Sequence, residues 1–182
     1  HFYRESHHFD FLETHILPGL IERARAGERV RIWSAGCSTG DEPYSLAICL
    51  LNAFPDAPSH DLKILATDVD RAALARATAA TYTRNSLRDM PPALVKTGFD
   101  RVPEAEHWTP KPPVRSMITF RQLNLIGDWP FRGQFDVIFC RNVAIYMDAE
   151  TQEQIWSGFR DRLRPDGHLF IGHSERLCRL LR

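Results

Sequence analysis

Hydrophobic and polar positions along the chain follow two patterns that alternate with each other. Short, nearly continuous apolar runs predict buried strands at residues 29–33, 62–68, 118–125, 135–142 and 168–172. Longer stretches with apolar residues every three to four positions separate several of these runs and predict helices. Because strands that alternate with helices build a parallel sheet, the pattern predicts a doubly wound α/β fold.

The predicted helices carry recognisable start signals. Asp41, Asp70 and Asp148 stand where helical stretches begin, so that a carboxylate can cap free backbone N–H groups. The first helix has a proline in its first turn and a glycine after its last residue. The sequence therefore predicts helices over 17–27, 41–54, 71–82 and 149–163, with a turn at 164–167 before the last strand.

An interval from about residue 84 to residue 117 interrupts this rhythm. It holds six of the twelve prolines among mixed charges. An unstructured loop of that length is unusual in a compact domain. We therefore expect one domain over residues 1–182 with an inserted subdomain at about 84–117, which contains a helix around 92–99 and a small β-hairpin.

Composition changes the picture mainly by exclusion. The 23 basic residues equal the 23 acidic ones, which argues against a nucleic-acid partner because such proteins present a basic face. No apolar stretch is long enough for membrane insertion and the first residues lack a signal-peptide core, so we expect a cytoplasmic protein. The four cysteines form no CxxC pair, so we expect neither a disulfide framework nor a metal site.

The first candidate ligand-binding residues lie in the turn after the first predicted strand. Gly36 and Gly40 lie in this turn and are followed by Asp41 and Glu42. A phosphate-binding P-loop would need a lysine here, and a dinucleotide site would need a third glycine and no acids that repel pyrophosphate. S-adenosylmethionine (SAM) carries a sulfonium and an ammonium but no phosphate, so acids beside the glycines attract it. Asp68, at the end of the second strand, is placed to accept hydrogen bonds from ribose hydroxyls.

Five strings of the sequence point to a known family. They cover residues 2–9 (FYRESHHF), 31–47 (RIWSAGCSTGDEPYSLA), 64–77 (ILATDVDRAALARA), 135–148 (FDVIFCRNVAIYMD) and 167–177 (GHLFIGHSERL). Together they resemble the CheR family of chemotaxis receptor glutamate O-methyltransferases, in the family's order and over most of the chain. The resemblance implies a Rossmann-like class I methyltransferase that moves a methyl group from SAM to glutamates on chemoreceptor cytoplasmic helices.

The resemblance also implies roles for individual residues. Arg4 would lie beside the reactive end of the cofactor, Glu42 would meet its methionine portion, and Asp68 would meet its ribose. Tyr146 would stand near the transferred methyl group and act with Arg4 in catalysis. The remaining cofactor-binding residues would be the turn residues Ala35, Gly36 and Gly40, the adenine contacts Asn124 and Leu125, and Arg141 and Asn142, which would close the pocket.

The family usually carries a small helical domain before this region, and we expect the chain to represent a monomeric catalytic domain without it. The inserted subdomain is expected to dock a receptor C-terminal tail by strand addition, by analogy with the family. A non-catalytic module that binds SAM or S-adenosylhomocysteine (SAH) is the alternative. A nicotinamide oxidoreductase is a further rival, which the missing third glycine argues against.

Overall fold

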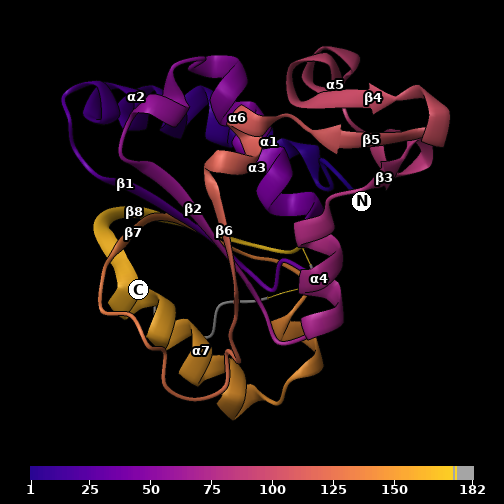
Figure 1. Cartoon of the computed structure of the whole chain (residues 1–182). Helices are drawn as coiled ribbons and strands as arrows, with labels where there is room; N and C mark the ends of the chain where they lie inside the picture. Colours follow the sequence, from indigo (N-terminus) through magenta and orange to yellow (C-terminus); the bar gives the residue numbers. More distant parts are fainter. Residues whose placement is uncertain (174, 176–182) are drawn as a thin grey trace.

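A computed structural model of the chain describes residues 1–173 and residue 175 (Figure 1). Its centre is a parallel sheet of five strands in the order β6-β2-β1-β7-β8. The chain order reverses beside β1, which has β2 on one side and β7 on the other, so the fold is the predicted doubly wound type. The strands are β1 Val30–Ala35, β2 Leu62–Asp68, β6 Ile118–Gln122, β7 Phe135–Cys140 and β8 Leu163–Ile171.

Helices cover both faces of this sheet, with α2 and α3 on one side and α7 on the other (Figure 1). The α-helices are α1 Ser6–Phe11, α2 Leu17–Arg25, α3 Asp41–Ala53, α4 Arg71–Ala79, α5 Pro92–Gly98, α6 Pro112–Ser116 and α7 Ala149–Arg162. A π-helical segment, Leu12–Ile16, joins α1 to α2, so the first helical region starts well before the predicted residue 17. Short 3-10 turns occupy Ala57–Ser59, Arg84–Leu87, Pro103–Ala105 and Ala144–Tyr146.

Two of the three predicted helix caps are confirmed. The Asp70 carboxylate accepts hydrogen bonds from the backbone N–H groups of Ala72 and Ala73, and Asp148 accepts one from Thr151. The prediction for Asp41 is wrong, because Gly40 is the N-cap of α3, with a φ of 93°. Asp41 instead occupies the first turn of α3, where its negative charge interacts favourably with the positive end of the helix dipole.

The alternation of side chains along the strands divides the core into two layers. Val137 and Phe139 of β7 pack in the layer under α2 and α3, whereas Ile138 and Cys140 pack in the layer under α7. Trp33 of β1 is fully buried in the α7 layer. Since both faces of β7 are buried, its sequence is apolar at every position except Asp136 rather than alternating.

The interval between α4 and β6 forms a small antiparallel sheet in the order β3-β5-β4 (Figure 1). Its strands are β3 Tyr82–Thr83, β4 Phe99–Val102 and β5 His107–Pro110. The expected helix (α5) and hairpin (β4 and β5) are present, and β3 is an addition that the sequence pattern did not predict. Gly98, the last residue of α5, lies so close to α3 that a Cβ there would stand 2.4 Å from Ile48, so α5 packs directly against the main domain.

The predicted turn at 164–167 is part of β8. The pairing of β8 with β7 shifts from Phe135 and Leu163 to Val137 and His168, so the residues between them form an irregular bulge instead of a separate turn. Within residues 1–173 and 175, no helix has the length and apolar character needed to cross a membrane.

Candidate cofactor site

The turn after β1 is held to the end of β2 by hydrogen bonds. The backbone N–H groups of Gly36 and Cys37 both donate to the Thr67 carbonyl, at 2.8 and 2.9 Å. The N–H of Ser38 donates to Asp68 Oδ2 at 2.7 Å, and the N–H of Asp70 donates to Oδ1 of the same carboxylate at 2.9 Å. Asp68 therefore fixes the glycine turn through one oxygen and its own loop through the other.

Both glycines of the turn are required by close packing. A Cβ on Gly36, whose φ is 77°, would stand 2.3 Å from Val143 Cγ2. A Cβ on Gly40 would stand 2.9 Å from the Tyr82 hydroxyl, which donates to the Thr39 carbonyl at 2.8 Å. The turn thus runs close to β7 on one side and to the inserted subdomain on the other.

A cavity of about 350 Å³ opens beside this turn, at the carboxyl ends of the strands. Five predicted site residues line it: Gly36, Asp68, Asn124, Leu125 and Asn142. Residues that were not predicted also line it, namely Ser38, Val69, Leu123, Val143 and Met147. The cavity is thus apolar over much of its wall and carries one carboxylate at its edge, a lining that suits a nucleoside.

A second cavity, of about 250 Å³, adjoins the first and shares Gly36, Ser38, Asn142 and Val143 with it. Its wall includes the predicted residues Arg4, Glu42 and Arg141, and also His1, Cys37, Thr39 and Asp41. Charged side chains dominate this part, in contrast to the larger cavity. The predicted site residues therefore line two adjoining cavities, one with a largely apolar wall and one with a largely charged wall.

Arg141 organises the charged part of the site. Its side chain is only 5% exposed, and its Nε donates to Glu42 Oε2 at 2.7 Å. Its Nη1 donates to the Arg4 carbonyl at 2.6 Å and lies 3.3 Å from Glu5 Oε2. Two carboxylates thus neutralise one buried guanidinium, and Arg141 holds the first residues of the chain against β7.

The other predicted residues take different positions. The guanidinium of Arg4 is exposed and donates to Asn142 Oδ1 at 3.3 Å. Ala35 is buried and Gly40 packs against Tyr82; the residues that line the two cavities do not include either of them. The backbone of Tyr146 lies in the 3-10 turn after β7, while its side chain lies outside the described part of the structure.

Comparison with known proteins identifies the family. The model of the family described as "CheR methyltransferase, SAM binding domain" matches residues 1–180. The chain belongs to the CheR methyltransferase family. A "Probable chemotaxis protein methyltransferase" of Rhizobium etli is 49% identical to this CheR domain over 97% of the domain and 66% of its own length. The "Chemotaxis protein methyltransferase" of Escherichia coli is 39% identical over 100% of the domain and 62% of its own length.

The CheR domain spans less than two thirds of the length of these relatives. Among solved structures, the "DszA carbon methyltransferase" superposes with a TM-score of 0.54 and 20% sequence identity, covering 91% of this chain and 35% of that one. This likeness supports the class I methyltransferase fold. The resemblance stated from the sequence and the predicted fold class are therefore confirmed.

Residues without a sequence signal complete the site of the CheR domain. Val143 lines both cavities and leaves no room for a side chain at position 36, but an apolar residue after a strand carries no recognisable pattern. Glu5, with a φ of 56°, contacts Arg141 and accepts hydrogen bonds from the backbone and ring of His173. Only its position next to Arg4 in the sequence could have indicated that Glu5 belongs to the site.

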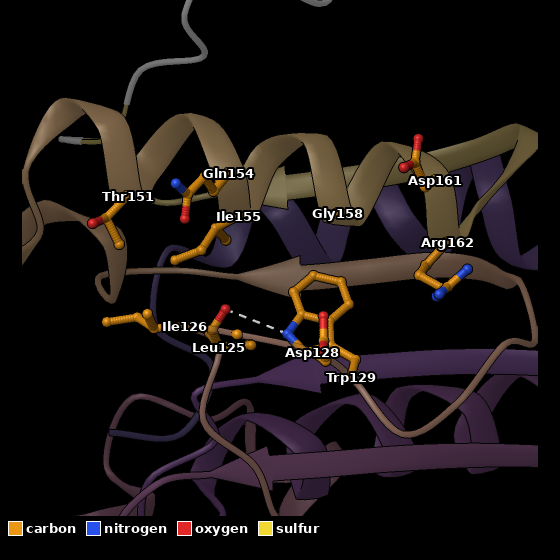
Figure 2. A pocket seen from close by; sticks show the side chains of 11 residues that line it. Leu125, Ile126, Asp128, Trp129, Thr151, Gln154, Ile155, Gly158, Asp161 and Arg162 are labelled. Carbon is orange, nitrogen blue, oxygen red and sulfur yellow. Dashed lines mark hydrogen bonds between the residues drawn. The ribbon is translucent and has the colours of Figure 1, made fainter.

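A third cavity, of about 300 Å³, lies between α7 and the loop after β6 (Figure 2). It shares Leu125 with the larger cavity of the site. Trp129 lies under α7 and donates through Nε1 to the Leu125 carbonyl at 3.3 Å, as the dashed line in Figure 2 shows. A Cβ on Gly158 would stand 2.8 Å from the Trp129 ring, so Trp129 packs directly against α7. Its hydrogen bond thereby connects α7 to the loop that carries the predicted adenine contacts.

The imidazole of His8 makes the stability of the CheR domain depend on pH. Burial, the Arg141 charge and neighbouring His7 lower the His8 pKa from 6.5 to about 4, although Glu5 opposes the change. Since the folded state keeps His8 neutral while the unfolded state binds a proton below pH 6.5, the free energy of unfolding should fall from pH 6.5 to about 4. Burial raises the Glu5 pKa, but hydrogen bonds from His173 and the charge of Arg141 lower it overall. Protonation of Glu5 should therefore lower the free energy of unfolding further as the pH falls below the ordinary carboxyl range.

Urea unfolding at a series of pH values measures this effect. His8→Gln is expected to flatten the profile between pH 6.5 and 4, because glutamine takes up no proton. His15→Gln removes an exposed imidazole that does not contribute to the His8 pKa and serves as the control. A wild-type profile that is flat over this range would contradict the prediction.

Proposed function

We propose that this CheR domain binds SAM across the two adjoining cavities and transfers its methyl group to glutamate side chains on chemoreceptor cytoplasmic helices. The adenosine would occupy the larger cavity, and the methionine portion would occupy the charged one. The observation that carries this proposal is the placement of both cavities around one glycine turn with Asp68 and Glu42 in their walls. Receptor helices as acceptors would place the enzyme in the cytoplasm, and we infer that it acts as a monomer.

The residues present suit SAM chemically. Asp68 offers carboxylate oxygens to ribose hydroxyls, and Asn124 and Leu125 offer backbone and apolar contacts to adenine. Glu42 offers a negative charge to the ammonium group, although Ser34 and Arg141 already bind its two oxygens. An anionic pyrophosphate would meet Asp41, Glu42 and Asp68 around the same turn, which supports SAM over a dinucleotide.

The reaction needs little proton chemistry from the protein. Bound SAM supplies an electrophilic methyl group on a sulfonium. A glutamate acceptor, with an ordinary pKa of about 4.3, is already an anion at neutral pH and requires no general base. The exposed guanidinium of Arg4 can hold that carboxylate with two hydrogen bonds, and Tyr146 is assigned to orient its oxygen. Positioning and exclusion of water then carry the catalysis.

Transfer of a radiolabelled methyl group from SAM to receptor cytoplasmic fragments tests this function. Mild alkali should release the label as volatile methanol, because glutamyl methyl esters hydrolyse whereas N-methyl groups do not. Arg4→Ala should reduce the rate of transfer, since it removes the exposed guanidinium beside the site. Binding of SAH without any transfer of label would instead favour the regulatory module.

A substitution at Asp68 tests cofactor binding separately from methyl transfer, through a carboxylate that also holds the glycine turn. Asp68→Asn keeps the size of the side chain but removes the charge and replaces one acceptor oxygen with a donor. The Kd for SAH, measured by calorimetry, is expected to rise about tenfold or more, which corresponds to about 1.4 kcal/mol. Asp70→Asn changes a neighbouring carboxylate in the same way while asparagine still caps α4, so its Kd should remain at the wild-type value. Equal Kd values for all three proteins would contradict the proposed role of Asp68.

The inserted subdomain suggests a second contact with the receptor. We propose that it binds an acidic receptor C-terminal tail, which adds a strand to an outer edge of the small sheet. A cavity of about 450 Å³ beside that sheet is lined by the apolar Leu87, Met90, Val95 and Trp108 and by Arg84 and Arg88.

Fluorescence anisotropy with a labelled tail peptide tests the contact between the receptor tail and the inserted subdomain. Arg88→Glu should weaken binding of the peptide and leave the Kd for SAH unchanged, whereas an unaltered peptide Kd would count against this surface.

A further inference from the structure

Glu175, which follows β8, makes an unusual set of hydrogen bonds for a single side chain. Its Oε2 accepts from the backbone N–H groups of Gly172, at 2.6 Å, and Asn142, at 3.0 Å. Its Oε1 accepts from the N–H groups of Val143, at 3.0 Å, and Ala144, at 2.9 Å. The residue is 7% exposed. One buried carboxylate thus satisfies four backbone donors.

Three of these donors belong to consecutive residues, Asn142, Val143 and Ala144, in the turn after β7. Asn142 has a φ of 59°, in the left-handed region. Consecutive N–H groups in a turn of this kind form a concave site for an anion. The protein fills that site with its own carboxylate, and without it the buried N–H groups would be left without a hydrogen-bond acceptor, which is unfavourable.

The turn that Glu175 holds is part of the cofactor site. Asn142 and Val143 line both cavities, and the Asn142 side chain accepts the hydrogen bond from Arg4. The Val143 side chain also faces Gly36, so its place determines the space left beside the glycine turn. A shift of this turn would therefore change both cavities at once.

We propose that Glu175 is a positioning residue for cofactor binding, which acts by fixing the backbone of residues 142–144 through its carboxylate. This inference rests on the proposed binding of SAM in the two cavities. Glu175 lines neither cavity, so its effect on affinity would be transmitted entirely through Asn142 and Val143. It acts as an internal anion that gives the turn one conformation before a ligand arrives.

Glu175→Gln tests the proposal, with Asp136→Asn as a matched control. The amide of glutamine keeps one acceptor oxygen and turns an NH2 group toward the other backbone donors. Asp136 is also a buried carboxylate, 4% exposed, that accepts from a backbone N–H, that of Arg31 at 2.7 Å, but it lies at the amino end of β7. Both variants should lower the thermal midpoint of unfolding, so stability alone does not distinguish them.

Two measurements separate the variants. Glu175→Gln should raise the Kd for SAH about tenfold and speed hydrogen exchange of the amides of residues 142–144, whereas Asp136→Asn should change neither. Glu175→Asp retains the charge on a shorter side chain and should give intermediate values, which keeps the test valid if the glutamine variant fails to fold. Unchanged affinity and exchange in a folded Glu175→Gln protein would overturn the proposal, and so would an equal loss of affinity in Asp136→Asn.

These results remain distinct from a failure of the proposed function. A wild-type protein that binds SAH but transfers no methyl group would overturn the reaction while leaving the comparison of Kd values intact. A wild-type protein that binds no SAH would overturn both the proposed function and the role of Glu175 in cofactor binding.

Discussion

Arg141→Met is expected to lower the free energy of unfolding by about 3–5 kcal/mol, the usual effect of removing one partner from a buried ion pair. Methionine preserves much of the apolar volume against Phe9 and Phe139, whose rings lie 5.4 and 5.6 Å from the guanidinium carbon. It leaves Glu42 and Glu5 without their cation and the Arg4 carbonyl without its donor. Urea unfolding at neutral pH measures the loss.

Arg160→Met is the matched control for this prediction. Arg160 is 48% exposed and pairs with Asp161 at 3.5 Å on the surface of α7. Pairs of this kind contribute about 0–1 kcal/mol, so the control should unfold close to the wild-type urea concentration. If Arg141→Met cost no more than Arg160→Met, the buried network would contribute little to the fold, and Arg141 would be available to a ligand instead.

Gly36→Ala is expected to weaken SAH binding about a hundredfold, an effect of about 2.7 kcal/mol. The added methyl group would stand 2.3 Å from Val143 Cγ2, and the φ of 77° is strained for any residue with a Cβ. Either the turn or Val143 must move, and both line the two cavities. Calorimetric titration with SAH measures the change.

Two further variants make this result specific. Gly36→Ala combined with Val143→Ala should recover part of the affinity, because the second change removes the methyl group that the new Cβ would meet. Gly19→Ala, in α2, adds a methyl group where no atom lies within 4 Å and should leave the Kd unchanged. A Gly36→Ala protein that binds SAH with the wild-type Kd would contradict the prediction, because it would show that the turn can move without loss of affinity.

Much of this arrangement could be predicted from local sequence. Asp68 ends one largely apolar strand and Asn142 follows another, and parallel strands place such residues at one edge of the sheet. The glycine turn followed by acids indicated a cationic nucleoside, and Glu42 does line a charged cavity beside the turn. Asp70 and Asp148 were predictable as caps because capping depends on residues only two or three positions away.

The features that sequence reasoning missed depend on distant contacts. Strand β3 has two residues and exists through its pairing with β5, so no periodicity marks it. Glu175 binds backbone N–H groups about thirty positions earlier in the chain, and backbone donors leave no trace in a pattern of side chains. Asp41 was assigned as a cap because the sequence does not reveal that Gly40 adopts the left-handed conformation of the N-cap, at a place where the distant residues Tyr82 and Ala77 leave no room for a Cβ.

The contact between Arg141 and the Arg4 carbonyl has a practical consequence for residue 1. Because the residues around Arg4 are tied to β7, His1 lies in the wall of the charged cavity. A small fluorophore placed on the side chain of this residue, introduced through His1→Cys, would therefore report the arrival of a ligand.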